Sequence, residues 1–446
     1  MEDYLVTILF GTFLVLLLIG APITVSLAVA ALASYLVLGE DPVAMVQIAY
    51  TSVGSFPLMA LPAFVLAGAL MEAAGISRRL VDVAEALAGP VTGGLGMTTV
   101  LACLFFGAIS GSGPATTAAV GMLMIPAMTR RGYDKSYAGA VTAASGGIGI
   151  IIPPSIPMVI FGVSAMGLPV PPEALEKYGE FSSVSIPKLF VAGILPGLLT
   201  AVGLIVMNYI LSRRHGYKGL TDRWSLAELG TAIRRGFWSL LAPCVILGGI
   251  YSGVFTPTES AVVAIAYTML VGVVMHRELT LAKLRDALRA TTWITGRVLL
   301  ILFAATVFGR LLVEQEIPAV LAESLLGLTD SLSVIWLILI VMLLFIGMFM
   351  ETLAAIMILV PVLMPIMYML GADPTHVGIV IICALSIGFQ TPPLGENLFV
   401  ASGISGMKVE QIVVKVLPFT LACVLVLLLI AFVPQLATWL PTLAGY

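Results

Sequence analysis

The chain alternates long apolar segments with short polar connections along its whole length. Most segments approach the roughly 20 residues that a helix needs to cross a hydrocarbon core. The segments that this pattern assigns are 4–20, 23–38, 56–75, 93–109, 115–129, 136–168, 188–212, 237–254, 257–275, 292–313, 333–350, 353–370, 375–406 and 416–440. No stretch between them is long and polar enough for a soluble domain, so the pattern predicts an all-α polytopic membrane protein.

Composition supports this prediction. Of the 446 residues, 60% are hydrophobic and only 10% are charged, whereas a soluble domain carries about 25% charged residues. The 44 Gly and 26 Pro residues fit membrane helices that pack closely and break often. No Lys or Arg precedes the first apolar run, so we expect residues 4–20 to be a retained span and not a cleaved signal.

The positive charges set the expected topology. Lys and Arg residues cluster at 78–79, 130–135, 213–235, 277–297 and 408–415, and by the positive-inside rule these clusters share the cytoplasmic side. The short segments on either side of residues 110–114 do not fit as two crossings. We therefore interpret 93–129 as a reentrant hairpin from the inside and 333–370 as its counterpart from the outside.

This topology places nearly all of the Lys and Arg residues on the cytoplasmic side. If each interrupted segment, 136–168 and 375–406, is one crossing, all but three of the 21 Lys and Arg residues lie inside. The exceptions are Lys177, Lys188 and Arg310. Both termini then lie on the periplasmic side of a bacterial inner membrane. The expected outer loops at 169–187 and 314–332 are acidic, an observation that was not used to build the topology.

The second half of the chain repeats pieces of the first in the same order. The three pairs of matching segments are 67–76 with 308–317, 116–126 with 351–361, and 149–154 with 388–393. Each half would hold five crossings and one hairpin, and an odd number of crossings makes the second half inverted relative to the first. Inverted repeats with broken helices are the recurrent architecture of secondary transporters. Chance similarity between apolar segments is the alternative.

The two expected repeats have the same plan. The first, 1–220, contains scaffold spans within 4–75, the hairpin 93–129, the broken helix 136–168 and the span 188–212. The second, 221–446, contains scaffold spans within 237–313, the hairpin 333–370, the broken helix 375–406 and the span 416–440. Two amphipathic segments, 76–90 and 277–290, are expected to lie on the inner membrane surface.

The first hairpin turns at Gly107–Thr117, which reads GAISGSGPATT. Unpaired backbone groups inside a membrane cost several kcal/mol each, so such a turn needs water, an ion or a substrate. The hydroxyls of Ser110 and Ser112 and the carbonyls of the ending half-helix suit Na⁺. The amides that begin the next half-helix suit a carboxylate. A close packing contact between small residues is the alternative.

Each interrupted helix carries a Pro-Pro pair. Pro153 and Pro154 remove two amide donors and free carbonyls about one turn earlier, near Gly149, and the pattern recurs at 388–393. We expect these carbonyls to face the hairpin tips. A proline kink without a ligand is the alternative.

Two carboxylates fall at the depth of the membrane in the second half. Glu351 precedes Thr352 at the second hairpin tip, and Glu396 follows the second break. Charged groups at this depth are costly and mark function by default, as cation ligands or proton carriers. Solvated or arginine-paired carboxylates are the alternative. The candidates for contact with an anion are Ser112, Gly113, Thr116, Thr117, Ser155, Glu351, Glu396 and Asn397.

Other polar residues have simpler explanations. We expect Arg310 to extend to the interface and Glu259 to cap a helix after Thr256. The four cysteines are expected to be small buried hydrophobes, and the three histidines have no metal-ligand spacing. No Ser/Lys, Ser/His or paired-Asp site of an intramembrane protease stands out, and no repeated rings of a channel pore. No nucleic-acid partner is expected.

Together these motifs resemble the large membrane subunit of the TRAP (tripartite ATP-independent periplasmic) transporters. The resemblance rests on 107–117, 151–156, 57–68 and 253–259 and extends from about residue 4 to residue 440. It implies an elevator mechanism, a small four-helix membrane subunit, a periplasmic substrate-binding protein and a small organic anion as substrate. A self-sufficient sodium- or proton-coupled symporter of the related elevator type remains the alternative.

The resemblance also implies two sodium sites and no organic cofactor. The first site would use Ser110, Ser112, Gly149, Ile152 and Pro154. The second would use Thr352, Gly388, Thr391 and Pro393. With no small-subunit segment before residue 4, the resemblance implies the unfused arrangement of the two membrane subunits.

Overall fold

The computed structural model describes residues 2–54, 56–219, 224–317, 331–393 and 395–446, together with residues 320, 327 and 329. All regular secondary structure in this described part is helical. Part of the expected outer loop 314–332, including Glu323 and Asp330, lies outside the described residues.

The helices of the first half follow the expected order. They are α1 (Glu2–Leu18), α2 (Ile23–Leu38), α3 (Pro42–Val53), α4 (Ala60–Ala73), α5 (Ile76–Ala88), α6 (Gly94–Ser110), α7 (Gly113–Arg130), α8 (Lys135–Gly146), α9 (Ile148–Ile151), α10 (Ile156–Ala165), α11 (Pro172–Tyr178) and α12 (Ile186–His215), with a 3₁₀ turn at Phe56–Met59.

The second half begins after α12. Its helices are α13 (Leu226–Tyr251), α14 (Pro257–Leu270), α15 (Leu281–Glu314), α17 (Leu332–Phe349), α18 (Thr352–Met369), α19 (Pro374–Gly388), α20 (Glu396–Ser405), α21 (Val409–Phe432) and α22 (Gln435–Leu443). A π-helical turn at Val271–Met275 follows α14.

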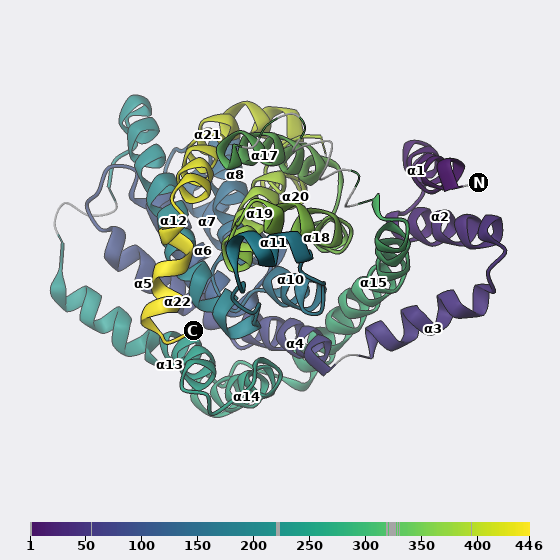
Figure 1. Cartoon of the computed structure of the whole chain (residues 1–446). Helices are drawn as coiled ribbons and strands as arrows, with labels where there is room; N and C mark the ends of the chain where they lie inside the picture. Colours follow the sequence, from purple (N-terminus) through teal and green to yellow (C-terminus); the bar gives the residue numbers. More distant parts are fainter. Residues whose placement is uncertain are drawn as a thin grey trace.

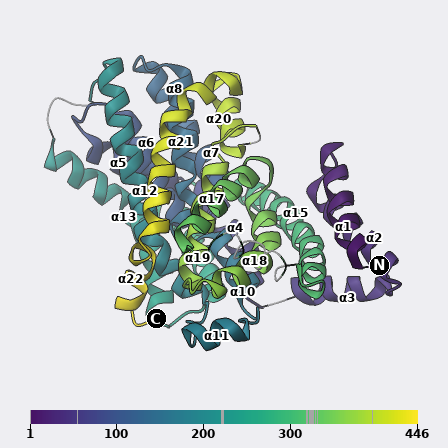
Figure 2. The same cartoon turned by 45° about the horizontal axis from the view of Figure 1, so that its top comes forward.

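The helices form an inner bundle bordered by an outer rim (Figure 1). The rim runs from α3 through α15, α4, α14 and α13 to α5, each packed against the next. The bundle contains α6 to α10 and α17 to α21 (Figures 1 and 2). The main described contacts between rim and bundle are those of α15 with α18 and of α5 with α6.

Length and composition are those of a multi-pass membrane protein. Among the described residues, seven helices are long and apolar enough to cross a membrane, or up to nine if each of two bent pairs is one span. The bent pairs are α4 with α5, at 69°, and α8–α9 with α10, at 42°. The second bend coincides with the expected interruption of 136–168.

All four expected interruptions are present. Helices α6 and α7 are separate on either side of Gly111 and Ser112, and α17 and α18 are separate on either side of Met350 and Glu351. Helix α9 ends at Ile151 before α10 begins, and α19 ends at Gly388 before α20 begins. Both Pro-Pro peptide bonds, at 153–154 and 392–393, are cis.

The two hairpins differ in how their arms pack. Helices α6 and α7 pack closely on each other. In the second hairpin, α17 packs mainly on α19, while α18 packs mainly on α15 and α10. The second tip therefore depends more on neighbouring helices than on its own partner arm.

Aspartate caps begin the broken helix of each half. Asp134 Oδ1 accepts from the amide of Ser136 at 2.6 Å, ahead of α8. Asp373 Oδ1 accepts from the amide of Thr375 at 2.8 Å, ahead of α19. Such caps satisfy amides that the first turn of a helix leaves without a partner, so both broken helices start at defined residues.

Glycines allow close backbone approach at equivalent places in the two halves. A Cβ atom on Gly107 would lie 2.8 Å from Gly149 Cα, and one on Gly388 would lie 2.7 Å from Gly347 Cα. In each case the obstacle is backbone, which cannot rotate away as a side chain can. The first arm of each hairpin is thus fitted against its broken helix without space for a methyl group.

An ion pair joins α5 of the first half to the connection between α14 and α15 in the second half. Arg79 on α5 forms an ion pair of 2.8 Å with Glu278, after the π-helical turn. Nearby, His276 Nδ1 lies 3.0 Å from the carbonyl oxygen of Ala74. The bend between α4 and α5 is therefore held against the connection between α14 and α15.

Some expectations about the elements are wrong. Residues 281–314 form one continuous helix, α15, so 277–290 is not a separate surface helix. Residues 42–53 form α3, although the hydrophobic pattern leaves them as a loop. The last span begins at Val409 and ends at Phe432, before α22. Cys244 is exposed, unlike the other three cysteines.

Replacing Gly388 by Ala should destabilise the protein by about 1–3 kcal/mol, the usual effect of overpacking. The matched control is Gly248→Ala on α13, where a Cβ would meet nothing within 4 Å. Melting of the purified protein in sodium-free detergent buffer measures both variants. Equal melting temperatures for Gly388→Ala and Gly248→Ala would show that the contact with Gly347 is not tight.

Candidate functional site

The first hairpin tip is a compact network of hydroxyl and backbone groups. Gly111 ends α6 in the left-handed conformation, with φ of 63°, which glycine adopts readily. Ser112 then caps α7. The hydroxyls of Ser110 and Thr116 lie 2.8 Å apart, and the Thr116 hydroxyl donates to the carbonyl of Ser112 at 2.7 Å. The tip thus joins the hydroxyls of Ser110 and Thr116 and the carbonyl oxygen of Ser112 in one hydrogen-bonded network.

The first helix break lies directly against this tip. The amide of Ile156, the first residue of α10, donates to the carbonyl of Gly111 at 3.3 Å. Ser155 caps α10 and donates its hydroxyl hydrogen to the carbonyl of Ile150 at 2.6 Å. A Cβ atom on Gly149 would lie 2.8 Å from the Ser112 carbonyl oxygen. The structure therefore brings the break and the tip together, but the carbonyls of Gly111 and Ser112 in the tip are directed at the break, and the carbonyl of Ile150 accepts the Ser155 hydroxyl within the break.

The residues expected in the first sodium site are mostly neighbours. Ser110, Ser112 and Gly149 meet as described above, and the carbonyl oxygen of Pro154 lies beside Gly111. Ile152 belongs to the same break, and its side chain packs against Gly197 of α12. Packing and hydrogen bonds hold these residues near one another.

The second tip and the second break also lie together, but the residue that begins the second arm of this hairpin makes no side-chain cap hydrogen bond. Glu351 stands before α18 without a side-chain cap hydrogen bond. The amide of Asn397 donates to the carbonyl of Phe389 at 3.0 Å across the second break. The Thr391 hydroxyl donates to the carbonyl of Ile387 at 2.6 Å. Gly388 packs against Gly347 of α17, so the break contacts the first arm of the hairpin as in the first half.

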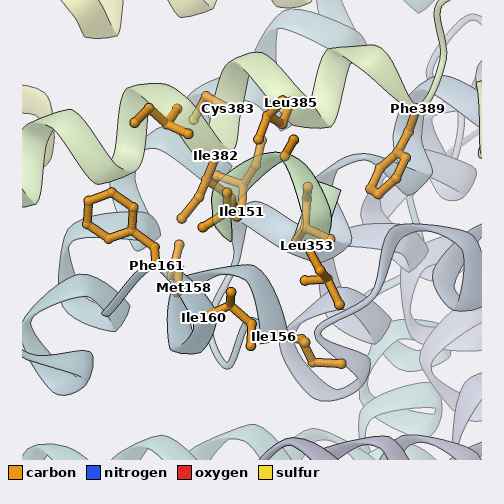
Figure 3. Close-up of a cluster of buried hydrophobic side chains, with 14 of the residues drawn as sticks. Ile151, Ile156, Met158, Ile160, Phe161, Leu353, Ile382, Cys383, Leu385 and Phe389 are labelled. Carbon is orange, nitrogen blue, oxygen red and sulfur yellow. The ribbon is translucent and has the colours of Figure 1, made fainter. Parts of the chain in front are cut away.

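An apolar cluster joins the two broken helices (Figure 3). In the close-up, Ile382, Cys383 and Leu385 of α19 lie over Ile151 of α9 and Met158 of α10, on either side of the first break. Ile156, Leu353 and Phe389 extend this cluster to the tips. The packing fixes the two breaks relative to each other.

Both tips and both breaks surround one small cavity of about 90 Å³, the central cavity. Helices α4 and α15 of the rim complete its wall. The residues that line it are Leu61, Val65, Gly111, Ser112, Gly113, Pro114, Ile150, Ile156, Pro157, Ile294, Val298, Glu351, Thr352, Leu353, Phe389 and Glu396.

Four helices begin at the wall of the central cavity. The wall includes residues from the first turns of α7, α10, α18 and α20. The N-terminus of a helix carries free amide donors and roughly half a positive charge. The amides of Ile156 in α10 and of Asn397 in α20 are already hydrogen-bonded to Gly111 and Phe389, so it is chiefly the positive dipole ends of the four helices that suit the cavity to an anionic group. From the sequence, only the N-terminus of α7 was expected to contribute in this way.

The remaining predicted residues occupy different places. Ser112, Gly113, Glu351, Thr352 and Glu396 line the central cavity. Thr117 and Asn397 are fully buried and do not line the cavity. The Thr117 hydroxyl donates to the carbonyl of Gly113 at 3.0 Å. The side-chain amide Nδ2 of Asn397 donates to the carbonyl of Ala143 at 3.0 Å. Thr391 and Pro393 lie in the second break but are not among the lining residues.

Sequence reasoning missed the contribution of the rim. Ile294 and Val298 of α15 and Leu61 and Val65 of α4 close the cavity. Their apolar side chains carry no signal of a site, because they look like any other residues of a membrane helix. Only packing in three dimensions identifies them.

A larger cavity of about 530 Å³ lies between α10, α15 and α18. Arg310 and Glu314 line it and form an ion pair of 2.7 Å on the same helix. The central cavity shares no lining residue with it. Arg310 thus does not line the central cavity.

Comparison with known proteins decides the family. Residues 10–436 match the family described as the DctM component of the tripartite ATP-independent periplasmic transporter. The chain belongs to the DctM family of TRAP transporters. This family is a family of transporters and not of enzymes.

Similar proteins include several named TRAP permeases. The chain is 44% identical over 97% of its length to an isethionate TRAP transporter permease protein, DctMQ, of Oleidesulfovibrio alaskensis, and spans 66% of that relative's length. It is 36% identical over 98% of its length to the C4-dicarboxylate large permease DctM of Rhodobacter capsulatus, covering 99% of it. It is 38% identical over 98% of its length to the sialic acid large permease SiaM of Vibrio cholerae, again covering 99% of the relative.

A solved structure shows a similar fold at low sequence identity. The Alcanivorax borkumensis YdaH transporter superposes with a TM-score of 0.63 at 16% identity, with 88% of this chain and 87% of that chain covered. This likeness supports the all-helical transporter fold of this DctM family member.

The hydroxyl of Thr116 should contribute about 1 kcal/mol to stability, since it joins Ser110 to Ser112 within the tip. Thr116→Val keeps the shape and removes that hydroxyl. The control is Thr129→Val, also on α7, whose hydroxyl bonds only to its own helix at Ile125. Thermal melting in detergent should show a lower temperature for Thr116→Val alone. A larger shift for Thr129→Val would contradict the network.

Proposed function

We propose that this chain is the large transmembrane subunit of a sodium-coupled TRAP transporter that imports a small organic anion. The observation that carries the proposal is the convergence of two hairpin tips and two helix breaks on one cavity. The positive dipole ends of helix N-termini would attract the anion, and broken helix ends would supply carbonyl and hydroxyl oxygens for Na⁺. Membership of the DctM family supports transport as the activity.

Two sodium sites are proposed next to the central cavity. The first lies between the first tip and the first break and uses Ser110, Ser112, Gly149, Ile152 and Pro154. These residues offer oxygen atoms from neutral groups, which suit a hard monovalent cation. The second lies between the second tip and the second break and uses Thr352, Gly388, Thr391 and Pro393.

An elevator mechanism is proposed because the helices divide into an inner bundle and an outer rim. The inner bundle would carry the cavity, and the rim of α3, α4, α5 and α13 to α15 would act as scaffold. The matching interruptions, aspartate caps and glycine contacts of the two halves support inverted repeats of 1–220 and 221–446. In this proposal the chain lies in a bacterial inner membrane with both termini periplasmic.

The proposed substrate is a carboxylate, sulfonate or sugar acid. Relatives are named for isethionate, C4-dicarboxylate and sialic acid, which share an anionic group and differ in size. The proposed partners are a small four-helix membrane subunit and a periplasmic substrate-binding protein. A self-sufficient symporter would instead transport without either partner.

Reconstituted uptake tests the proposal. Proteoliposomes that contain this chain and the small subunit, supplied with the binding protein, should accumulate an anion only when Na⁺ is higher outside. Uptake that ignores the sodium gradient would contradict sodium coupling. Uptake by this chain alone would favour the self-sufficient symporter.

Removing a proposed sodium ligand should raise the Na⁺ concentration for half-maximal uptake by about tenfold, which corresponds to about 1.4 kcal/mol. The variants are Ser112→Ala for the first site and Thr352→Ala for the second. Ser182→Ala is the control, since its exposed hydroxyl bonds to Asp373 away from the cavity. Unchanged sodium activation in Ser112→Ala and Thr352→Ala would rule out these assignments.

A further inference from the structure

Three arginines line a cavity on the rim that shares no lining residue with the central cavity. It has a volume of about 490 Å³ and lies between α5, α13 and the segment 275–278 that follows α14. We call it the arginine cavity. Its lining residues are Arg78, Arg79, Asp82, Arg235, Trp238, Met275, His276 and Glu278. The proposed sodium and anion sites use none of these residues.

Two of the three arginines have no partner in the described part of the chain. Arg79 is paired with Glu278 at 2.8 Å. Arg78 and Arg235 take part in no ion pair or side-chain hydrogen bond among the described residues. The charges of Arg79 and Glu278 cancel, and Asp82 offsets one of the two remaining arginines. The wall therefore keeps one positive charge in excess, because a guanidinium does not lose its proton in proteins.

A buried nitrogen in the same wall is also without a partner. His276 Nδ1 lies 3.0 Å from the carbonyl oxygen of Ala74. Its other ring nitrogen, Nε2, is buried and has no hydrogen-bond partner among the described residues. A buried polar atom of this kind is costly unless another group satisfies it. A polar ligand in the cavity would bring such a group to this wall.

Exposed apolar side chains border the arginine cavity. Trp238 and Met275 line it and are 38% and 44% exposed. Phe237, Val273 and Val274, their neighbours in the chain, are exposed as well. In a membrane protein such a surface meets acyl chains, and tryptophan favours the level of the headgroups. Positive charge and lipid-facing apolar surface thus adjoin at one cavity.

The cavity lies where membrane spans end. The candidate span that contains α14 runs from Pro257 to Met275, and Met275 is part of the cavity wall. On α13, Arg235 precedes the apolar stretch that begins at Gly236. Arginines at this level lie beside the phosphates of the lipid headgroups. The clusters of Lys and Arg place this end of the rim on the cytoplasmic side in the proposed topology.

We propose that the arginine cavity binds the headgroup of an anionic phospholipid, with Arg78 and Arg235 on its phosphate. A guanidinium binds a phosphate through two N–H groups. A phosphodiester carries one negative charge, which matches the single positive charge in excess. The acyl chains extend over the apolar border that includes Trp238 and Met275. Basic pockets between membrane helices on the cytoplasmic side suit such headgroups. The inference goes beyond the proposed transport and does not depend on the substrate.

A lipid bound here would join three parts of the rim. Helices α5 and α13 and the segment 275–278 all contribute to the cavity, and α5 is one of the main links from the rim to the bundle, through α6. A ligand that binds the folded protein and not the unfolded chain stabilises the fold. Bound lipid should therefore raise the melting temperature of the protein.

The test measures melting of the purified full chain in micelles of a neutral detergent mixed with phosphatidylglycerol or with phosphatidylcholine. Phosphatidylglycerol should raise the melting temperature in a saturable way, and phosphatidylcholine, which has no net charge, should not. Inorganic phosphate at the same concentration should have no effect, because it lacks acyl chains. Equal stabilisation by phosphatidylcholine would overturn the preference for an anionic lipid. Stabilisation by inorganic phosphate would overturn the lipid assignment in favour of a soluble anion.

Charge variants locate the effect. Arg78→Gln and Arg235→Gln should each raise the apparent Kd for phosphatidylglycerol about fivefold, which corresponds to about 1 kcal/mol. The control is Arg214→Gln, an exposed arginine at the end of α12 that does not line the cavity. Its Kd should match that of the wild type. Unchanged melting of each variant in phosphatidylcholine establishes that it folds.

A variant of opposite sign separates charge from structure. Asp82→Asn removes the negative charge that opposes the phosphate, so it should lower the Kd for phosphatidylglycerol. A merely structural role of the arginines predicts no such gain. The inference is overturned if Arg78→Gln and Arg235→Gln bind as Arg214→Gln does, or if Asp82→Asn binds no more tightly than the wild type.

The complete transporter supplies the last comparison, because the proposed small membrane subunit could cover this face instead of lipid. Stabilisation by phosphatidylglycerol should persist in the complex, with the same loss in Arg235→Gln. Its disappearance in the complex would overturn the inference and assign the surface to the protein partner. These measurements contain neither substrate nor a sodium gradient, so a failure of sodium-driven uptake would contradict the proposed function and leave the lipid site untouched.

Discussion

An interrupted membrane helix must find partners for the backbone groups that the interruption sets free, and four such interruptions determine this structure. Each unsatisfied group would cost several kcal/mol away from water. In the protein, backbone groups freed at these interruptions form hydrogen bonds with each other, either between a break and a hairpin tip or across a single break. The amide of Ile156 reaches the carbonyl of Gly111, and the amide of Asn397 reaches that of Phe389. Neither pair could exist if its helices continued unbroken.

The same constraint explains the small residues of the bundle. Backbone groups can partner across helices only if the helices approach closely, and a side chain larger than hydrogen prevents that approach. Gly149 beside Ser112 and Gly388 beside Gly347 are such places. The apolar cluster of α19 with the first break then keeps the approach fixed (Figure 3). Packing thus helps to hold the polar groups of the tips and breaks in position.

Much of this was predictable from local sequence, because breaks have local causes. The motif GSGP at Gly111–Pro114 and the two Pro-Pro pairs each interrupt a helix through their own chemistry. The continuity of α15 was not predictable in this way, since its amphipathic beginning, 281–290, resembles a surface helix in sequence. Helix α3 was missed because its pattern is too short and mixed to suggest a helix. The roles of Ile294 and Val298 depend on which helix packs beside which, and a single sequence does not contain that information.

The way in which the central cavity would attract an anion affects which substrates it could accept. Most of the anion-binding capacity proposed here comes from the positive dipole ends of four helices, which attract any anionic group. Such a site can accept a carboxylate or a sulfonate with little change, in keeping with relatives named for isethionate, C4-dicarboxylate and sialic acid. Discrimination among these must then depend on the few side chains that add charge or shape to the wall.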